Sequence, residues 1–177
     1  MQNYDELKHK ADNGDTLAQL NLAEAYFNGD VSGSPELGNG MHYMGMAASS
    51  GNAKIQHMYA SMLAKLGLEE QAFMWYEKAA LNDCPESQAK LSLCYYNGTC
   101  TSKNDKLALK WAQQAYKNGD KIESCYVLGF LYLEGNVVRS DAVQAYKMFK
   151  EAAMNGDEDS INIIRKLDEQ FPQLRRM

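Results

Sequence analysis

A motif that recurs four times constrains this chain more than any other feature of its 177 residues. The clearest copy lies in residues 121–157. Its first half carries L-G-x-x-Y-x-x-G from Leu128 to Gly135. Its second half carries A-x-x-Φ-x-x-x-A-x-x-x-G from Ala145 to Gly156, where Φ is large and apolar. Both halves repeat apolar residues every three or four positions, the spacing that lines one face of a helix. We therefore expect a helix hairpin here.

Three earlier copies keep the same columns. Leu22, Tyr59 and Leu91 fill the Leu128 column, so the steps between copies are 37, 32 and 37 residues. The other columns follow in order: Ala23, Ala60 and Ser92 match Gly129; Tyr26, Leu63 and Tyr95 match Tyr132; Tyr43, Trp75 and Trp111 match Met148; Ala47, Ala79 and Ala115 match Ala152. A period in this range is typical of a solenoid of helix pairs.

Turn residues mark the ends of the expected helices. Gly29, Gly98 and Gly135 stand just past a first helix, where a left-handed residue closes the last turn. Asn-Gly-Asp at 13–15, 118–120 and 155–157 ends a second helix and offers Asp as a cap for the next. Six helices follow from these signals: 3–12, 16–28, 38–50, 53–66, 69–82 and 158–168. A further helix starts at Pro85, and Phe171–Met177 is expected to be frayed.

The columns L-[GAS]-x-x-[YL]-x-x-G and A-x-x-[WY]-x-x-x-A-x-x-x-G resemble Sel1-like repeats, which are related to tetratricopeptide repeats. The loop from Gly135 to Asp141 resembles the family's G-x-G-V-x-x-D connection, although Asn136-Val137 replaces the usual x-G. The resemblance covers roughly residues 5–160. It implies an all-α, α/α superhelical solenoid of about four helix-pair repeats with capping helices at both ends.

We expect a single repeat domain over residues 1–177. It divides into an N-terminal cap helix in 1–14, repeats at 15–51, 52–83, 84–119 and 120–156, and a C-terminal cap helix and tail in 157–177. The second repeat has only Gly67-Leu68 between its helices. Glycines at 38, 40 and 45 are expected to weaken the second helix of the first repeat, because each costs about 1 kcal/mol relative to alanine.

Amino-acid composition and net charge limit the fold class and the kinds of partner that the protein can bind. The hydrophobic content of 45% is enough for a core, and β-branched residues are few, which favours helix over strand. A net charge of −5 disfavours nucleic acid and anionic membranes, since both need a positive surface. No apolar run approaches the ~18 residues of a membrane-spanning helix. The N-terminus lacks the basic start and apolar core of a signal peptide, so we expect a cytoplasmic protein. A cleaved leader would instead imply a periplasmic or secreted one.

No motif predicts catalysis, a metal or a cofactor. The sequence contains no H-E-x-x-H, no G-x-x-x-x-G-K-[ST], no G-x-S-x-G and no Cys pair with zinc spacing. Some relatives pair cysteines across each repeat. Cys125 keeps the first position of that pattern but Ala153 stands at the second, so thiols are expected. We therefore expect a protein that is not an enzyme. The alternative is a hydrolase that uses a Cys or His of the groove.

First helices line the concave side of a helix-pair solenoid. Positions two before, two after and five after the Leu128 column are expected to face that groove, and Ala89 is one of them. The candidate partner-binding residues are Glu24, Phe27, His57, Glu86, Tyr96, Glu123, Tyr126 and Phe130. Tyr96, Tyr126 and Phe130 are expected to form one aromatic patch among acidic residues. Alternatively, a tight superhelix buries Tyr126 and Phe130 against the neighbouring first helix.

The resemblance implies a non-catalytic scaffold or adaptor that binds a partner protein or peptide on its concave surface. The acidic surroundings of the patch indicate a partner of basic or mixed charge. Small acidic members of the family act as immunity proteins against a cognate toxin, which is a narrower expectation. A structural module of a longer chain is a third possibility. We expect a monomer, with weak dimerisation as the alternative.

Overall fold

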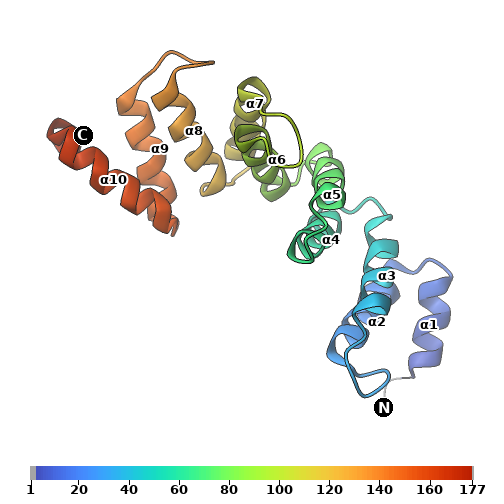
Figure 1. Ribbon diagram of the computed structural model, residues 1–177. Helices are drawn as coiled ribbons and strands as arrows, with labels where there is room; N and C mark the ends of the chain where they lie inside the picture. Colours follow the sequence, from blue (N-terminus) through green and yellow to red (C-terminus); the bar gives the residue numbers. More distant parts are fainter. Residues whose placement is uncertain (1–2, 177) are drawn as a thin grey trace. The chain divides into compact units, whose positions relative to one another are not determined.

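A computed structural model describes residues 3–176, and within that range it contains helices and no strand (Figure 1). The α-helices are α1 Tyr4–Asp12, α2 Thr16–Asn28, α3 Leu37–Ala48, α4 Ala53–Lys65, α5 Glu69–Leu81, α6 Pro85–Asn97, α7 Asp105–Lys117, α8 Glu123–Glu134, α9 Ala142–Met154 and α10 Glu158–Gln170. A 3₁₀ helix follows at Pro172–Arg176. The six helices predicted with both ends are all present, each within two residues of its expected bounds.

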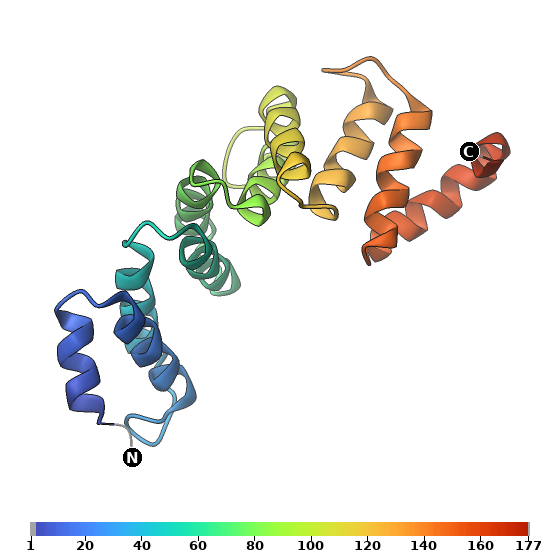
Figure 2. The same cartoon turned by 180° about the vertical axis from the view of Figure 1, so that it is seen from behind.

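The chain divides into two compact units, Met1–Asn82 and Asp83–Met177. Unit 1 contains α1 to α5, and unit 2 contains α6 to α10 with the 3₁₀ helix. Consecutive helices form antiparallel hairpins: α2 with α3 and α4 with α5 in unit 1, and α6 with α7 and α8 with α9 in unit 2 (Figures 1 and 2). The single repeat domain and its repeat boundaries stay predictions.

The helix ends follow the predicted turn chemistry. Gly98 and Gly135 have φ of 73° and 72°, a left-handed conformation that costs glycine little and other residues more. At the start of α2, the Asp15 carboxylate accepts a hydrogen bond from the Ala18 backbone N at 2.9 Å. Asp157 does the same for Ser160 at the start of α10, at 2.8 Å. These caps satisfy backbone donors that a helix start leaves unpaired.

Within a hairpin, an aromatic ring lies directly on a glycine backbone. A Cβ atom added at Gly129 of α8 would lie 2.6 Å from Cζ of Phe149 of α9, and the Phe149 side chain is fully buried. Gly40 of α3 receives the ring of Phe27 in the same way. Gly45 faces the Tyr59 hydroxyl, which a Cβ atom would approach to 3.0 Å. Two of the three glycines expected to weaken α3 therefore have a packing role.

The repeat-column aromatics differ in burial. Tyr26 and Tyr43 are buried and stack with ring centroids 5.8 Å apart. Trp75 and Trp111 are only half-buried. Lys78 Nζ lies 3.8 Å from the Trp75 ring centroid and Lys110 Nζ lies 5.3 Å from that of Trp111. A cation above the ring shields the exposed face of each tryptophan.

Buried glutamines form a further repeat column. Gln19, Gln56 and Gln88 are 4%, 5% and 1% exposed, with the same steps as the leucine column. Gln56 Oε1 accepts a hydrogen bond from Asn82 Nδ2 at 3.0 Å, and Gln88 Oε1 accepts one from Asn118 Nδ2 at 2.9 Å. These bonds join the first helix of a repeat to the end of its second helix, which offsets the cost of burying the amides. In the fourth repeat, Cys125 occupies the column.

The prediction of a frayed tail is wrong. Pro172–Arg176 forms the 3₁₀ helix, and Leu174 is 3% exposed in a core cluster with Tyr146, Phe149 and Leu167. The apolar surface between α9 and α10 gives this leucine a place to bury. Met177 lies outside the described residues.

The Gly129–Phe149 contact gives a stability test. We expect Gly129→Ala to lower the free energy of unfolding by about 1–2 kcal/mol, since overpacking costs more than the helix-propensity gain of about 1 kcal/mol. The matched control is Gly38→Ala in α3, where an added Cβ meets nothing within 4 Å. The control should be neutral or stabilising by up to about 1 kcal/mol. Guanidinium unfolding followed by circular dichroism measures both, and equal stabilisation by the two changes would contradict the packing account.

Candidate partner-binding surfaces

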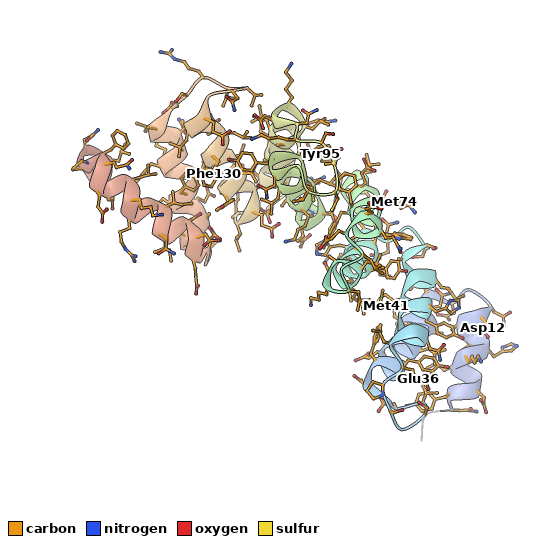
Figure 3. All side chains as sticks on the ribbon, in the orientation of Figure 1. Asp12, Glu36, Met41, Met74, Tyr95 and Phe130 are labelled. Atoms are coloured by element: carbon orange, nitrogen blue, oxygen red, sulfur yellow. The ribbon has the colours of Figure 1, made fainter. Side chains whose placement is uncertain are left out.

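Tyr96 of α6 with Tyr126 and Phe130 of α8 form one cluster of rings in unit 2, which we call the aromatic surface. The Tyr96 and Phe130 ring centroids are 5.9 Å apart and nearly parallel. Tyr126 meets Phe130 edge to face at 5.0 Å. All three side chains are half-buried, and Figure 3 labels Phe130 on α8. The structure therefore brings together the three rings expected to form a patch.

Polar and core contacts fix these rings from two sides. The Tyr96 hydroxyl donates a hydrogen bond to Glu134 Oε1 at 2.5 Å, and Lys103 Nζ lies 4.9 Å from the Tyr96 ring centroid. Burial, followed by the hydrogen bond to Glu134 and its negative charge, raises the pKa of Tyr96 well above its usual range. Phe130 rests edge to face on Phe149 at 5.1 Å. The expected burial of Tyr126 and Phe130 against a neighbour is therefore partial, because each keeps an outer side open.

A pocket of about 280 Å³ adjoins this surface, which we call the acidic pocket. It is lined by Leu93, Asn97, Glu123, Tyr126, Asp157 and Asp159. Glu123 forms an ion pair with Lys90. Asp157 uses one oxygen, Oδ2, to cap α10. Burial, then the charges of Asp159 and Asp157, raises the pKa of the Tyr126 hydroxyl.

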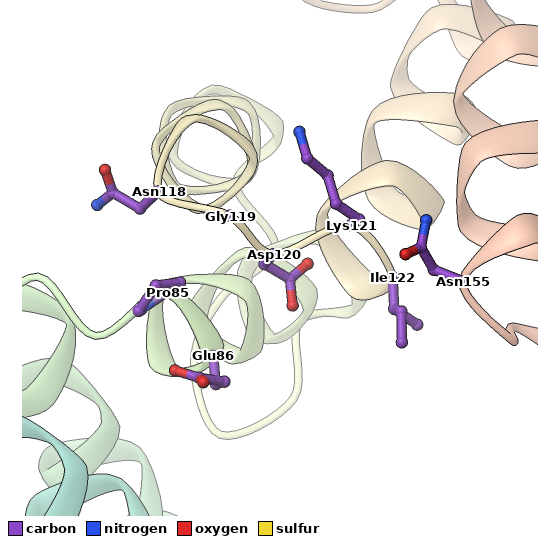
Figure 4. Close-up of a pocket in the computed structure, with 8 residues that line it drawn as sticks. All are labelled: Pro85, Glu86, Asn118, Gly119, Asp120, Lys121, Ile122 and Asn155. Atoms are coloured by element: carbon purple, nitrogen blue, oxygen red, sulfur yellow. The ribbon is translucent and has the colours of Figure 1, made fainter.

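Glu86 lies apart from the acidic pocket. It lines a different hollow of about 330 Å³, formed mainly by the turn between α7 and α8 (Figure 4). The side chains of Glu86, Asn118 and Lys121 point in different directions there. Lys121 Nζ is held over the Tyr116 ring, 3.2 Å from its centroid. The polar side chains of this hollow therefore do not converge on one position where a ligand could bind.

Unit 1 has an apolar pocket of about 520 Å³ between α2, α3 and α4. Its lining includes Leu17, Leu20, Glu24, Phe27, Met44, Met58 and Met62. A second pocket of about 260 Å³ shares Met62 and adds Leu37, Met41, Lys65 and Leu66; Figure 3 labels Met41. We call the two together the methionine groove. Leu17 is 67% exposed and Met58 is 49% exposed. Exposed apolar side chains that adjoin one another are typical of binding sites.

The sequence rule for groove positions holds in some repeats and fails in others. Glu24 and Phe27 line the methionine groove, although the Phe27 ring also packs on Gly40. Ala89, expected in the groove, is fully buried. In the second repeat the groove is lined by Met58 and Met62, one position after the expected His57 and Ser61. One position is a rotation of about 100° around a helix.

His57 instead packs beside Tyr76, with ring centroids 5.6 Å apart, and its Nε2 lies 3.4 Å from Ser61 Oγ. Asp157 and Asp159 were not predicted as site residues. The Asn-Gly-Asp turn at 155–157 could have indicated Asp157, because a residue that caps a helix also projects a carboxylate beside the preceding hairpin. Asp159 lies two residues beyond this turn.

Two of the four thiols, Cys84 and Cys125, have the wrong chemistry for a nucleophile. Burial raises the pKa of Cys125 to about 12. Burial also raises the pKa of Cys84, whose Sγ donates a hydrogen bond to Glu86 at 3.1 Å. A catalytic cysteine needs a lowered pKa, since the thiolate is the attacking form. Among residues 3–176, no group of three or more His, Cys, Asp or Glu side chains is placed to hold a metal ion. Over the same range, no helix is both long and apolar enough to cross a membrane.

Comparison with known proteins identifies the protein family. The sequence matches the Sel1 repeat over residues 16–52, 60–84, 85–120 and 122–157. These four matches span most of the chain, so the protein belongs to the Sel1-repeat family and its fold is an all-α superhelical solenoid of about four repeats. Sel1 repeats mediate protein–protein interactions.

Individual relatives are similar over most of this chain. Chitin synthase regulatory factor 3 of Schizosaccharomyces pombe is 30% identical in an alignment 149 residues long, which covers 78% of this chain and 16% of that protein. The chain therefore spans about a sixth of this relative's length.

Two solved structures share the fold. A protective antigen of uropathogenic Escherichia coli with an SLR fold is 28% identical, with a TM-score of 0.78 over 96% of this chain and 37% of that one. A Sel1 repeat protein from Oxalobacter formigenes is 20% identical, with a TM-score of 0.70 over 93% of this chain and 75% of that one. The second likeness concerns the fold alone.

A thiol titration tests the account of the cysteines. At pH 8 we expect the exposed Cys100 to react first with a chromogenic disulfide, while Cys84 and Cys125 react only when the protein unfolds. A raised pKa leaves little thiolate at this pH, and burial blocks access. Cys100→Ser should remove the fast phase and leave the slow phases unchanged. Fast reaction of Cys125 at pH 6 would contradict the account and favour the hydrolase alternative.

Proposed function

We propose that this protein is a non-catalytic scaffold that binds a partner protein or peptide through the aromatic surface of unit 2. The observation that carries the proposal is the cluster of Tyr96, Tyr126 and Phe130, whose rings contact one another at 5.0–5.9 Å while each stays partly open. Tyrosine and other large aromatic side chains dominate the binding energy of protein interfaces. The family supports this class of function, since Sel1 repeats mediate protein–protein interactions.

The aromatic surface is prepared for binding before a partner arrives. Glu134 holds the Tyr96 hydroxyl, and Phe149 supports Phe130 from the core. Rings that are already fixed lose little side-chain entropy on association, so more of the contact energy remains as affinity.

The partner proposed for this surface is basic or mixed in charge. Glu123, Asp157 and Asp159 adjoin the rings, and the whole chain carries −5. Complementary charge speeds association and selects against acidic competitors. Glu86 belongs to the same proposal as a more distant charge.

The methionine groove of unit 1 is the second contact that we propose. Glu24 and Phe27 lie in it, and His57 belongs to the same helix as Met58 and Met62. Methionine side chains are flexible and polarisable, so a groove rich in them adapts to different apolar segments. This site serves the apolar part of a partner.

A narrower form of the proposal is an immunity protein that neutralises a cationic toxin or effector. An immunity protein would bind a single partner with nanomolar affinity, whereas an adaptor would bind several partners weakly. A regulatory role like the one named for the fission-yeast relative is a coarser alternative. A monomer in the cytoplasm remains part of our proposal. The hydrolase alternative gains nothing from the raised pKa of Cys84 and Cys125.

Affinity capture from a lysate of the source organism tests the scaffold role. The bait proteins are the wild type, Tyr96→Ala, and Tyr96→Ala combined with Tyr126→Ala and Phe130→Ala. Met154→Ala is the control, because Met154 is 80% exposed on α9 of the same unit. We expect a protein retained by the wild type and the control but at least about tenfold depleted with the single variant, as for a hot-spot tyrosine.

The single variant carries the test, because Tyr126 and Phe130 also contact the core and their loss can unfold unit 2. A helical circular dichroism spectrum and an unchanged melting temperature are required of every variant. Equal capture by wild type and Tyr96→Ala would remove the aromatic surface from the proposal. Loss of the same protein with Met154→Ala would mean that a different face binds it.

A further inference from the structure

The acidic pocket differs from an ordinary solvated group of carboxylates in having an aromatic and apolar wall. Tyr126 and Leu93 provide that wall, while Glu123, Asp157 and Asp159 supply negative charge. The described residues that line the pocket include no Lys or Arg. Lys90 compensates Glu123 from outside the lining, which leaves the charges of Asp157 and Asp159 without a cationic side chain in the pocket.

Helix α10 alone does not account for this arrangement. Carboxylates are common in the first turn of a helix because they oppose the positive end of its dipole. Glu158 and Asp159 are both in that turn, yet only Asp159 lines the pocket. Glu123 and Tyr126 come from α8, the first helix of the preceding hairpin, and Leu93 comes from α6. Three separate helices therefore line one space.

We infer that the acidic pocket receives an arginine side chain from the segment of a partner that lies on the aromatic surface. This inference rests on the proposed scaffold function and names the chemistry of the partner. Three observations support it: the charge of the lining, the tyrosine wall, and the continuity of Tyr126 with Phe130 and Tyr96.

A guanidinium group fits this lining better than an ammonium group. It is planar, stacks on an aromatic ring, and donates hydrogen bonds in a fork that can reach two carboxylates. Asp157 has its Oδ1 oxygen available because the cap uses Oδ2. The Asp159 carboxylate accepts no hydrogen bond from the part of the chain that the structure describes. Guanidinium is also less strongly hydrated than ammonium, so entering a half-buried site costs it less.

The acidic pocket, at about 280 Å³, has room for one side chain. A long, slender side chain with its charge at the tip can fill it, while its aliphatic part contacts Leu93.

Nuclear magnetic resonance titration of the ¹⁵N-labelled protein tests the inference. The probes are three capped tripeptides, acetyl-Gly-X-Gly-amide, where X is arginine, lysine or citrulline. Citrulline has nearly the shape of arginine without its charge. We expect the arginine probe to bind in the millimolar range, because a single exposed contact is weak, and to shift amide signals of residues that line the acidic pocket.

Asp159→Asn should weaken the arginine probe by about two- to fivefold, the effect of one partly exposed ion pair. Glu158→Gln is the matched control, since it removes the same charge from the same turn of α10 without touching the pocket, and it should change nothing. Equal binding of citrulline, equal binding of lysine, or equal effects of the two substitutions would each overturn the inference.

The result is independent of the capture experiment. A partner that depends on Tyr96, together with no arginine-specific shifts, would keep the scaffold function and reject the arginine pocket. Arginine-specific shifts at the acidic pocket without any partner that depends on Tyr96 would support the pocket and reject the aromatic surface as the main contact.

Discussion

The contact between the Phe149 ring and the bare backbone at Gly129 supports much of unit 2. It sets the distance between α8 and α9, because any side chain at position 129 would push the ring away. Phe149 is fully buried and touches Tyr126 and Phe130 edge to face, at 6.3 and 5.1 Å. The aromatic surface is therefore supported by the Phe149 ring, whose position depends on Gly129. Unit 1 uses the same device with Phe27 and Gly40.

The binding surfaces arise from the same elements that make the repeats. Each helix pair buries one stripe against its own partner, and the first helices α6 and α8 carry the half-buried rings of Tyr96, Tyr126 and Phe130. The next helix then adds its capping turn, which brings Asp157 and Asp159 beside Tyr126. Fold and candidate site are thus coupled, since a cap that starts α10 also forms one wall of the acidic pocket.

Local signals in the sequence were sufficient for the helices, because capping residues and glycines act on their immediate neighbours. Asp15 and Gly135 sit where their chemistry predicted. Side-chain direction was harder to predict. In the repeat with the short Gly67-Leu68 connection, Met58 and Met62 line the groove in place of His57 and Ser61. A rule that counts positions from the leucine column cannot predict that one helix is rotated about its axis. Leu174 was missed because its burial depends on a surface far from it in sequence. Ala89 was misplaced because a small residue suits a groove and a helix crossing equally.

Our central claim is that a partner segment lies along the aromatic surface with an arginine in the acidic pocket. Site-specific photo-crosslinking in cells tests it most directly, with a benzophenone amino acid at Asn97, which is exposed and lines the pocket, and at Met154 as the control position. The account predicts one cross-linked protein from position 97, joined through a peptide that contains arginine, and none from position 154. Cross-links from position 154 alone, or from position 97 to segments without a basic residue, would contradict it.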